Sequence, residues 1–529
     1  MIRASIASAI AVAVTVLNPV APAFGQDETD QRYGTVHFAT SCTETAQRRF
    51  DRGMRYQHSF WYQESQEIFE DVLKADPECG IAYWGIALSL LYNPHAPPPA
   101  PNLPLGLAAL QKGKAVGAKT QRERDYIDAL TVFYANYDTV SHAQRVQAYL
   151  NAMEALARKY PSDDEAQIFY AITLNVAASP NDKTYTNQLK GAAILEPIFR
   201  RQPRHPGVAH YLIHLYDTPA LAERGLDAAK RYAAIAPAAP HALHMPSHIF
   251  TRVGDWSDSI SSNIASERAA KDSKAFADEL HAMDYLVYAY LQIAQDQKAR
   301  AVVADMNKVP LNPDQFPGPY ALAASPARYA MERGDWKGAA ELEIRPSKFP
   351  YTDAMTYFAR ALGAARSGNP GDAIADIAKL AELREKLRAT KDAYWTEQVD
   401  IQWQIARAWN LYAEGKHDEA LKAMSAAADA EDKTEKHPVT PGAPIPAREL
   451  LGQMLIDLGT AREALAAFEA TLKKEPNRFN AIAGAARAAE LLGDNVKAKD
   501  YYQRLTTIAN DADTVRPEIA AARKYLAQN

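Results

Sequence analysis

Short helical repeats shape most of this chain. Small and aromatic residues recur with the spacing of a helix–turn–helix unit of about 34 residues. In one copy Gly53 and Phe69 take the repeat's small and aromatic positions, and in another copy Gly452 and Phe468 take the same positions. Each helix pair buries its apolar face only by stacking on its neighbours. The pattern therefore predicts an all-α chain in which helix pairs follow one another as a solenoid.

Glycines mark the predicted turns between the paired helices. Five of them lie in phase with the repeat: Gly334, Gly368, Gly415, Gly459 and Gly493. An alanine-rich helical chain could show such a pattern by chance, but five turn glycines in phase argue against that. We expect irregular repeats over 26–205, histidine-rich central repeats over 206–300 and regular repeats over 301–529.

The first 25 residues have the pattern of a targeting segment. Arg3 precedes an apolar run from Ile6 to Leu17, and small residues and prolines follow. This order is typical of a signal peptide, and the run is too short to span a bilayer comfortably. The rest of the chain has no comparable apolar run, so we expect no membrane span. The segment predicts a protein of the periplasm or a secreted protein.

The two cysteines, Cys42 and Cys79, fit this location. In an oxidising compartment the expected state of such a pair is a disulfide. Two buried free thiols are the alternative. The chain has no C-x-x-C-H string, which excludes covalently attached haem.

Composition and motifs exclude several functions. There are 59 Lys and Arg residues against 64 Asp and Glu, and no strongly basic block occurs, which argues against a nucleic-acid partner. No phosphate-binding glycine loop is present, so we expect no nucleotide. The strings H-E-x-x-H and G-x-S-x-G are absent too, and the catalytic residues, if any, stay unknown.

Several strings resemble a known group of proteins. A-Y-W-G-I-A-L-S-L at 82–90, P-H-A-L-H-M-P-S-H-I-F-T-R-V-G-D-W at 240–256 and K-H-P-V-T-P-G at 436–442 resemble exported bacterial tetratricopeptide-repeat proteins. The resemblance implies a right-handed solenoid of tetratricopeptide-like helix–turn–helix repeats. Because that superfamily binds ligands in its concave groove, it also implies a peptide, protein or small-molecule partner there. It assigns no role to any single residue.

Histidines gather in the central repeats. Seven of the thirteen lie between His205 and His281, in strings that include H-Y-L-I-H at 210–214 and H-A-L-H-M-P-S-H at 241–248. Residues three, four and seven apart share one face of a helix. In the tetratricopeptide frame, the positions that face the concave wall are occupied by His210, His214, His241, His244, His248, His281 and Asp284.

These seven residues form the predicted metal site. First helices of stacked repeats lie roughly 8–10 Å apart, so imidazoles on neighbouring helices can reach a common ion. Neutral imidazoles, with or without a carboxylate such as Asp284, suit zinc, copper, nickel or iron. Two alternatives stay open: a polar groove that hydrogen-bonds a ligand, and purely structural hydrogen bonding. His58, beside Trp61 and Glu64, is interpreted as core packing.

Proline leaves two questions about local structure. Pro246 falls where a helix from Pro240 should already be running, and a proline there costs about 3 kcal/mol, unless the helix begins at Pro246 itself. Two proline-rich stretches, 93–104 and 437–446, are predicted to be irregular. We expect at least one of them to touch the concave side; plain linkers are the alternative.

Two functions follow. The first is an exported repeat scaffold whose histidine-lined site binds a transition metal and could support metal-dependent catalysis. The second is a metal-free tetratricopeptide scaffold that binds a peptide or partner protein in its groove.

Overall fold

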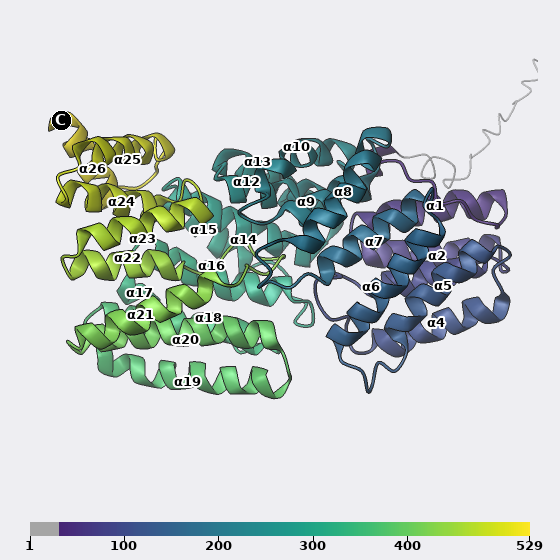
Figure 1. Cartoon of the computed structure of the whole chain (residues 1–529), viewed down its shortest axis with the longest axis horizontal. Helices are drawn as coiled ribbons and strands as arrows, with labels where there is room; N and C mark the ends of the chain where they lie inside the picture. Colours follow the sequence, from purple (N-terminus) through teal and green to yellow (C-terminus); the bar gives the residue numbers. More distant parts are fainter. Residues whose placement is uncertain (1–30, 529) are drawn as a thin grey trace, which may run out of the picture.

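The structure is a computed structural model that describes residues 31–528. The predicted signal peptide, 1–25, lies outside these residues. Within them the chain is all-α: it forms α-helices and two short 3₁₀ helices, and no strand occurs in this range. No helix of the described part is long and apolar enough to cross a membrane. The fold class predicted from the repeats is therefore confirmed as an array of packed helices (Figure 1).

Consecutive helices pack against one another along the chain. The N-terminal helices are α1 (Glu44–His58), α2 (Tyr62–Ala75), α3 (Gly80–Ser89), α4 (Asn102–Val116), α5 (Gln121–Tyr134), α6 (His142–Lys159), α7 (Asp164–Val176) and α8 (Thr186–Arg201). The central helices are α9 (Pro206–Tyr216), α10 (Leu226–Ile235), α11 (Pro240–His244), α12 (Pro246–Val253), α13 (Trp256–Ser273) and α14 (Phe276–Gln292).

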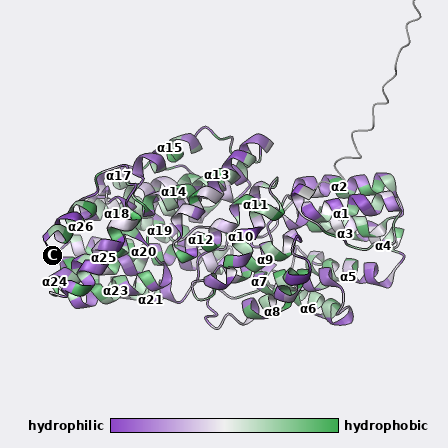
Figure 2. Cartoon of the chain, turned by 90° about the horizontal axis from the view of Figure 1, so that it is seen from above, coloured by the Kyte–Doolittle hydropathy of each residue, from purple (hydrophilic) through white to green (hydrophobic). Residues whose placement is uncertain are grey.

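The C-terminal helices continue the same pattern. They are α15 (Asp296–Met306), α16 (Pro317–Glu332), α17 (Trp336–Ala340), α18 (Pro350–Arg366), α19 (Pro370–Ala389), α20 (Ala393–Ala413), α21 (His417–Asp432), α22 (Ala447–Asp457), α23 (Ala461–Lys474), α24 (Phe479–Leu491), α25 (Asn495–Ile508) and α26 (Pro517–Gln528). Figure 2 shows that individual helices carry both hydrophilic and hydrophobic residues, as stacked repeats require.

Glycine performs the two tasks that the repeat pattern predicts. All five turn glycines adopt positive φ, for example +82° at Gly368, which a residue without a Cβ does at little cost. At the helix crossings a Cβ on Gly53 would lie 2.9 Å from the Phe69 ring, and one on Gly452 would lie 2.8 Å from the Phe468 ring. The pairing of small and aromatic positions is therefore confirmed.

The predicted disulfide is present. Cys42 and Cys79 are joined, with their Cα atoms 5.1 Å apart, so the segment before α1 is tied to the start of α3. Phe38 lies in this segment and packs on Phe50 and Trp84, with ring centroids 5.1 and 5.4 Å away. The bridge therefore holds the segment around Phe38 against the core of the N-terminal helices.

We expect the Cys42→Ser, Cys79→Ser double variant to have a free energy of unfolding lower by roughly 3–4 kcal/mol, because the unfolded chain without the disulfide has more conformational entropy. Urea unfolding of both proteins measures the difference. Reduction of the wild type should lower its stability to the level of the variant and leave the variant unchanged; equal stability of wild type and variant would contradict the expectation.

The C-terminal repeats fold back onto the central ones. Arg516, just before α26, forms a buried ion pair with Asp296 at the start of α15, with Nε 3.0 Å from Oδ2. The Trp256 indole N–H of α13 donates to the carbonyl oxygen of Asn477, 2.8 Å away. Figure 1 shows the C-terminal helices, in yellow, near the central helices in teal. The repeats therefore do not leave an open array: their last members close against α13–α15.

Candidate metal centre

Helix α9 presents the first two histidines of the site. Its first turn is capped by His205, whose Nδ1 accepts the Val208 backbone N–H at 3.3 Å, and Pro206 starts the helix where a missing N–H costs nothing. Every residue of α9 is buried. His210 and His214, four residues apart, therefore point together into the protein interior.

Helices α11 and α12 present the next three. The chain breaks its helical hydrogen bonding at Pro246, so the alternative in which a helix begins there is confirmed. Met245 nevertheless keeps helical angles, φ −53° and ψ −36°. The histidines divide within α11: the His241 ring lies 5.0 Å from that of His210 on α9, whereas the His244 ring lies 4.2 Å from that of His281 on α14, between centroids.

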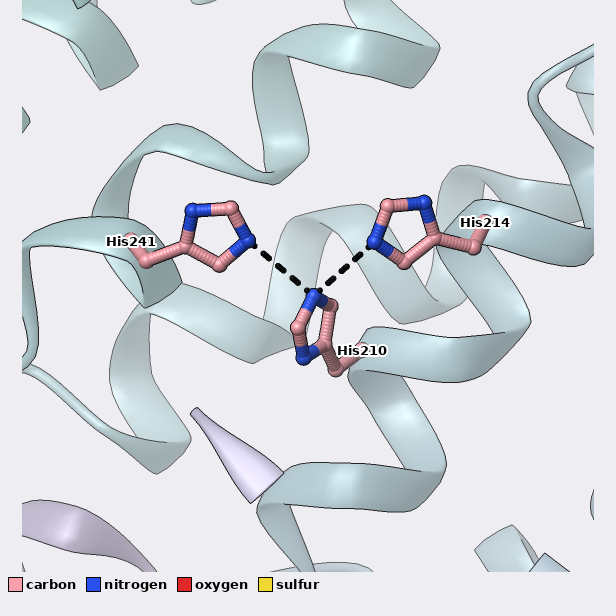
Figure 3. A group of neighbouring side chains, drawn as sticks. All are labelled: His210, His214 and His241. Atoms are coloured by element: carbon pink, nitrogen blue, oxygen red, sulfur yellow. Dashed lines mark hydrogen bonds between the residues drawn. The ribbon is translucent and has the colours of Figure 1, made fainter. Parts of the chain in front are cut away.

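Three imidazoles form what we call the first triad: His210, His214 and His241. The Nε2 atom of His210 lies 3.1 Å from that of His214 and 3.2 Å from that of His241 (Figure 3). The Nδ1 of His210 donates to a carbonyl oxygen, so its Nε2 presents a lone pair to the other two imidazoles. This is the arrangement that a bound cation stabilises.

Three others form the second triad: His244, His248 and His281. The Nε2 atoms of His244 and His248 are 3.0 Å apart, and the His281 ring lies 4.2 Å from that of His244 between centroids. In each triad one ligand nitrogen per residue lies within 4.8 Å of the others. The hydroxyl of Tyr285 lies 3.3 Å from His248.

The two triads are neighbours. The rings of His214 and His248 are 5.9 Å apart between centroids, and so are those of His241 and His244. Sequence analysis predicted one cluster; the structure brings all six histidines together but divides them into two adjacent sets.

Polar groups behind the triads fix three of the six imidazoles. The Nδ1 of His210 donates to the His58 carbonyl oxygen at 2.7 Å, that of His244 to Asn263 Oδ1 at 2.6 Å, and that of His248 to Asp217 Oδ2 at 2.9 Å. A donor hydrogen on Nδ1 leaves the Nε2 lone pair free to face the centre. Metal-binding histidines in proteins are held in this way.

Asp217 is the charged anchor of the second triad. Its carboxylate also accepts from Arg252 Nε at 2.8 Å and Lys436 Nζ at 2.7 Å. Burial alone would raise the pKa of Asp217, but the two cations hold it well below its usual value. Burial also lowers the pKa of Lys436 to about 8. Asp217 therefore stays an acceptor for His248 at any ordinary pH.

Burial keeps the triad histidines neutral. It lowers the pKa of His210 and His281 to about 3, and it lowers the pKa of His214, His241 and His244 well below the usual value. The charges of neighbouring histidines add to this effect. Neutral imidazole is the form that binds a metal ion.

The first proline-rich stretch and the residue before the second reach the centre. His95 of the first stacks near His214, with ring centroids 4.5 Å apart, and Lys436, just before the second, reaches Asp217. The first stretch therefore contacts a histidine of the first triad, and the expectation that one of the stretches touches the concave side stays a prediction. The predicted irregular structure of 93–104 is wrong at its end: Asn102, Leu103 and Pro104 already belong to α4, where proline is tolerated in the first turn.

Asp284 does not join the histidines. Its carboxylate accepts from Ser325 Oγ at 2.9 Å and forms a buried ion pair with Arg328. Asp284 lies three residues after His281 on the same helix, which is why it was predicted as a ligand. Arg328 of the neighbouring helix α16 pairs with its carboxylate instead. The predicted ligand Asp284 is therefore corrected to a partner of Arg328.

A third group of buried polar side chains, His58, Glu165 and His205, was not predicted from the sequence. Glu165 accepts from His58 Nε2 at 3.0 Å and from His205 Nε2 at 2.9 Å. His58 packs on Phe169, as its interpretation as core predicts, but its carbonyl oxygen also holds His210. Glu165 lies about forty residues from His205 in sequence, and no local pattern links them.

Comparisons with known proteins assign no family. No family model and no curated protein matches this chain. Among solved structures, the human IFIT1 dimer with m7Gppp-AAAA aligns at 12% identity over 81% of this chain and 90% of that one, with a TM-score of 0.33. The APC/C hetero-tetramer Cut9-Hcn1 aligns at 12% identity over 91% and 96%, with a TM-score of 0.27. At such TM-scores neither bears on function.

Proposed function

We propose that this protein is an exported helical-repeat scaffold that binds two transition-metal ions, one in each histidine triad. The observation that carries the proposal is the convergence of Nε2 atoms, 3.0–3.2 Å apart, with Nδ1 atoms held by a carbonyl, an amide and a carboxylate. Three neutral nitrogen ligands suit zinc, copper, nickel or iron.

The ligand number favours a reactive centre over a structural one. Structural zinc sites are closed by four protein ligands, whereas catalytic sites offer three and leave a position for water or substrate. Each triad offers three. A bound metal would supply Lewis-acid or redox chemistry there, while the chain positions the imidazoles and places the Tyr285 hydroxyl beside His248.

Export is part of the proposal. The Cys42–Cys79 disulfide supports an oxidising compartment, and the first 25 residues have the pattern of a signal peptide. Periplasm or secretion is the location that fits both.

A metal-free scaffold is the second candidate function. A cleft of about 560 Å³, measured to its open mouth, lies beside Asp217 and is lined by charged side chains that include Arg252, Lys436 and Glu475. Two polar atoms in its wall, Gln398 Nε2 and Thr434 Oγ1, are buried and have no hydrogen-bond partner among residues 31–528. A polar segment of a peptide or partner protein would satisfy them.

Metal content of protein purified without a histidine tag tests the first function. We expect two ions per chain in the wild type, and one each in His214→Ala and His244→Ala, because each change removes a ligand from one triad. The exposed His37, which pairs with Asp51, gives the control: His37→Ala should keep two ions. A chelator should lower the melting temperature, since an ion at a hundred times its Kd stabilises by about 2.7 kcal/mol.

Each other outcome has a definite meaning. One ion per chain that both variants lose would mean a single shared site. No ion under any metal supplied would end the metal proposal and leave the polar-ligand scaffold.

A further inference from the structure

A second cleft lies beside the first triad, because its lining residue Phe60 packs on His210. Its volume is about 540 Å³ including the open mouth, within the range of small-molecule sites. We call it the tyrosine cleft. Its aromatic wall consists of Phe60, Tyr62, Tyr92, Tyr149, Phe169 and Tyr211, and no lining residue is charged.

Phe60 is the wall that the tyrosine cleft shares with the triad. Its ring lies 4.2 Å from that of His210 and 5.2 Å from that of His241, between centroids. Its backbone has φ +56°, a left-handed conformation that is rare for a bulky side chain and persists only when the surroundings fix it. A molecule in the cleft would therefore lie one aromatic ring away from the imidazoles.

Two hydroxyls of the cleft lack partners. Tyr62 and Tyr149 are each only 8% exposed. Their phenol oxygens are buried and have no hydrogen-bond partner within residues 31–528. A further phenol of the wall, Tyr211, is paired with His58 Nδ1 at 3.0 Å. An unpaired buried hydroxyl costs free energy, so two of them in one cleft indicate a ligand that pairs with them.

The chemistry of the lining defines that ligand. Burial raises the pKa of Tyr62 and Tyr149, so both remain O–H donors at neutral pH. Donors require an acceptor oxygen on the ligand. A charged ligand would lose its hydration with no counter-charge in the wall, which excludes carboxylates and amines. Aromatic walls favour a flat apolar body through ring contacts.

We propose that the tyrosine cleft binds a small, uncharged aromatic molecule whose oxygen accepts hydrogen bonds from Tyr62 and Tyr149. The cleft contains no metal ligand, so this binding is independent of the proposed metals. Its place beside Phe60 would hold an organic substrate or product next to the first triad, an extension that rests on the proposed function.

Equilibrium dialysis with three probes of similar shape tests the proposal. 2-Naphthol has a neutral ring system and an oxygen, naphthalene lacks the oxygen, and 2-naphthoate is charged. We expect 2-naphthol to bind at one site per chain, naphthalene to bind about two- to tenfold more weakly, as the loss of a hydrogen bond predicts, and 2-naphthoate to show no saturable binding.

Variants separate the cleft from a nonspecific surface. Tyr62→Phe and Tyr149→Phe should each weaken 2-naphthol binding about two- to tenfold and leave naphthalene binding unchanged. Neither should lower stability, because each removes a hydroxyl without a partner. Tyr170→Phe is the control: its hydroxyl donates to Glu154 at 2.9 Å outside the cleft, and 2-naphthol binding should not change.

Binding of 2-naphthol can be measured independently of metal binding. Chelator-treated protein should bind 2-naphthol as the untreated protein does. Equal binding of 2-naphthol to the wild type and to both phenylalanine variants, or equal binding of 2-naphthoate, would overturn the proposal, whatever the metal content.

Discussion

The free energy of unfolding should fall steeply as the pH drops from 7 to 5.5. Burial lowers the pKa of ten of the thirteen histidines below the usual value: His58, His95, His142, His210, His214, His241, His244, His248, His281 and His437. These side chains must stay neutral in the folded protein and become charged only when it unfolds.

The sign follows from proton uptake. Below the unfolded pKa of about 6.5, each such histidine binds a proton in the unfolded chain but not in the folded one. Stability is then lost as the pH falls, by up to about 1.4 kcal/mol per pH unit for each residue, until the folded pKa is reached. For His210 and His95 that limit lies at about 3 and about 4. A bound metal keeps the same sign, because metal-bound imidazole is also neutral.

Buried carboxyl groups act in the opposite direction. Burial raises the pKa of Glu431, Glu449 and Asp278 to about 7, so these groups bind protons in the folded state first and stabilise it as the pH falls. Asp278 counts for less, because its side chain is 35% exposed. Other carboxyl groups have a pKa raised by less, and three groups at about 7 do not offset ten histidines. Total stabilities of about 5–15 kcal/mol would be exhausted within two pH units.

Urea unfolding at pH 7.5, 6.5 and 5.5, followed by tryptophan fluorescence, measures this slope. His142 provides the matched variant: burial and the charge of Arg145 lower its pKa to about 4, and it belongs to neither triad. His142→Leu should reduce the slope by about 1.4 kcal/mol per pH unit and keep the metal content. A stability that stays constant from pH 7.5 to 5.5 would contradict the burial of neutral histidines.

The repeat frame was predictable because its determinants are local. Turn glycines and the small residue opposite an aromatic, such as Gly53 opposite Phe69, are read directly from spacing, and the structure confirms both. The face shared by His210 and His214 follows from the same helical period. These features depend on a few neighbouring residues of one helix pair, and they could therefore be predicted from the sequence.

What escaped prediction depends on partners far along the chain. Asp284 has the right position on α14, yet Arg328 on α16 takes its carboxylate. Asp217 and Lys436, which support the second triad, are separated by 219 residues. The division of six histidines into two triads falls between His241 and His244, both on α11, because His210 of α9 meets the first and His281 of α14 meets the second.

The packing of the C-terminal repeats against the central ones also depends on residues far apart in sequence. Arg478 lies in the middle of this contact. The guanidinium is fully buried, pairs with Glu332 of α16 and Glu449 of α22, and donates to the Tyr288 hydroxyl of α14 at 3.1 Å. Burial would lower the pKa of Arg478, but the surrounding carboxylates raise it. One cation therefore neutralises buried acids from separate helices.

We expect Arg478→Met to destabilise the protein by about 3–5 kcal/mol, because two buried carboxylates lose their counter-charge. Adding Glu332→Gln and Glu449→Gln to this variant should recover much of the loss, since no unpaired charge is then buried. The exposed pair of Lys497 and Glu469 gives the control, and Lys497→Ala should cost no more than about 1 kcal/mol.

Urea unfolding of the wild type and the three variants at pH 7.5 measures these differences in stability. Metal binding at the second triad gives an independent measurement. Tyr288 lies on α14, the helix that carries His281, so loss of closure in Arg478→Met should also weaken metal retention at the second triad and spare the first. A cost below 1 kcal/mol would mean that Arg478 does not hold the closed array together. Restoration of stability by the two glutamine changes would identify charge neutralisation, rather than the shape of the arginine side chain, as the cause of closure.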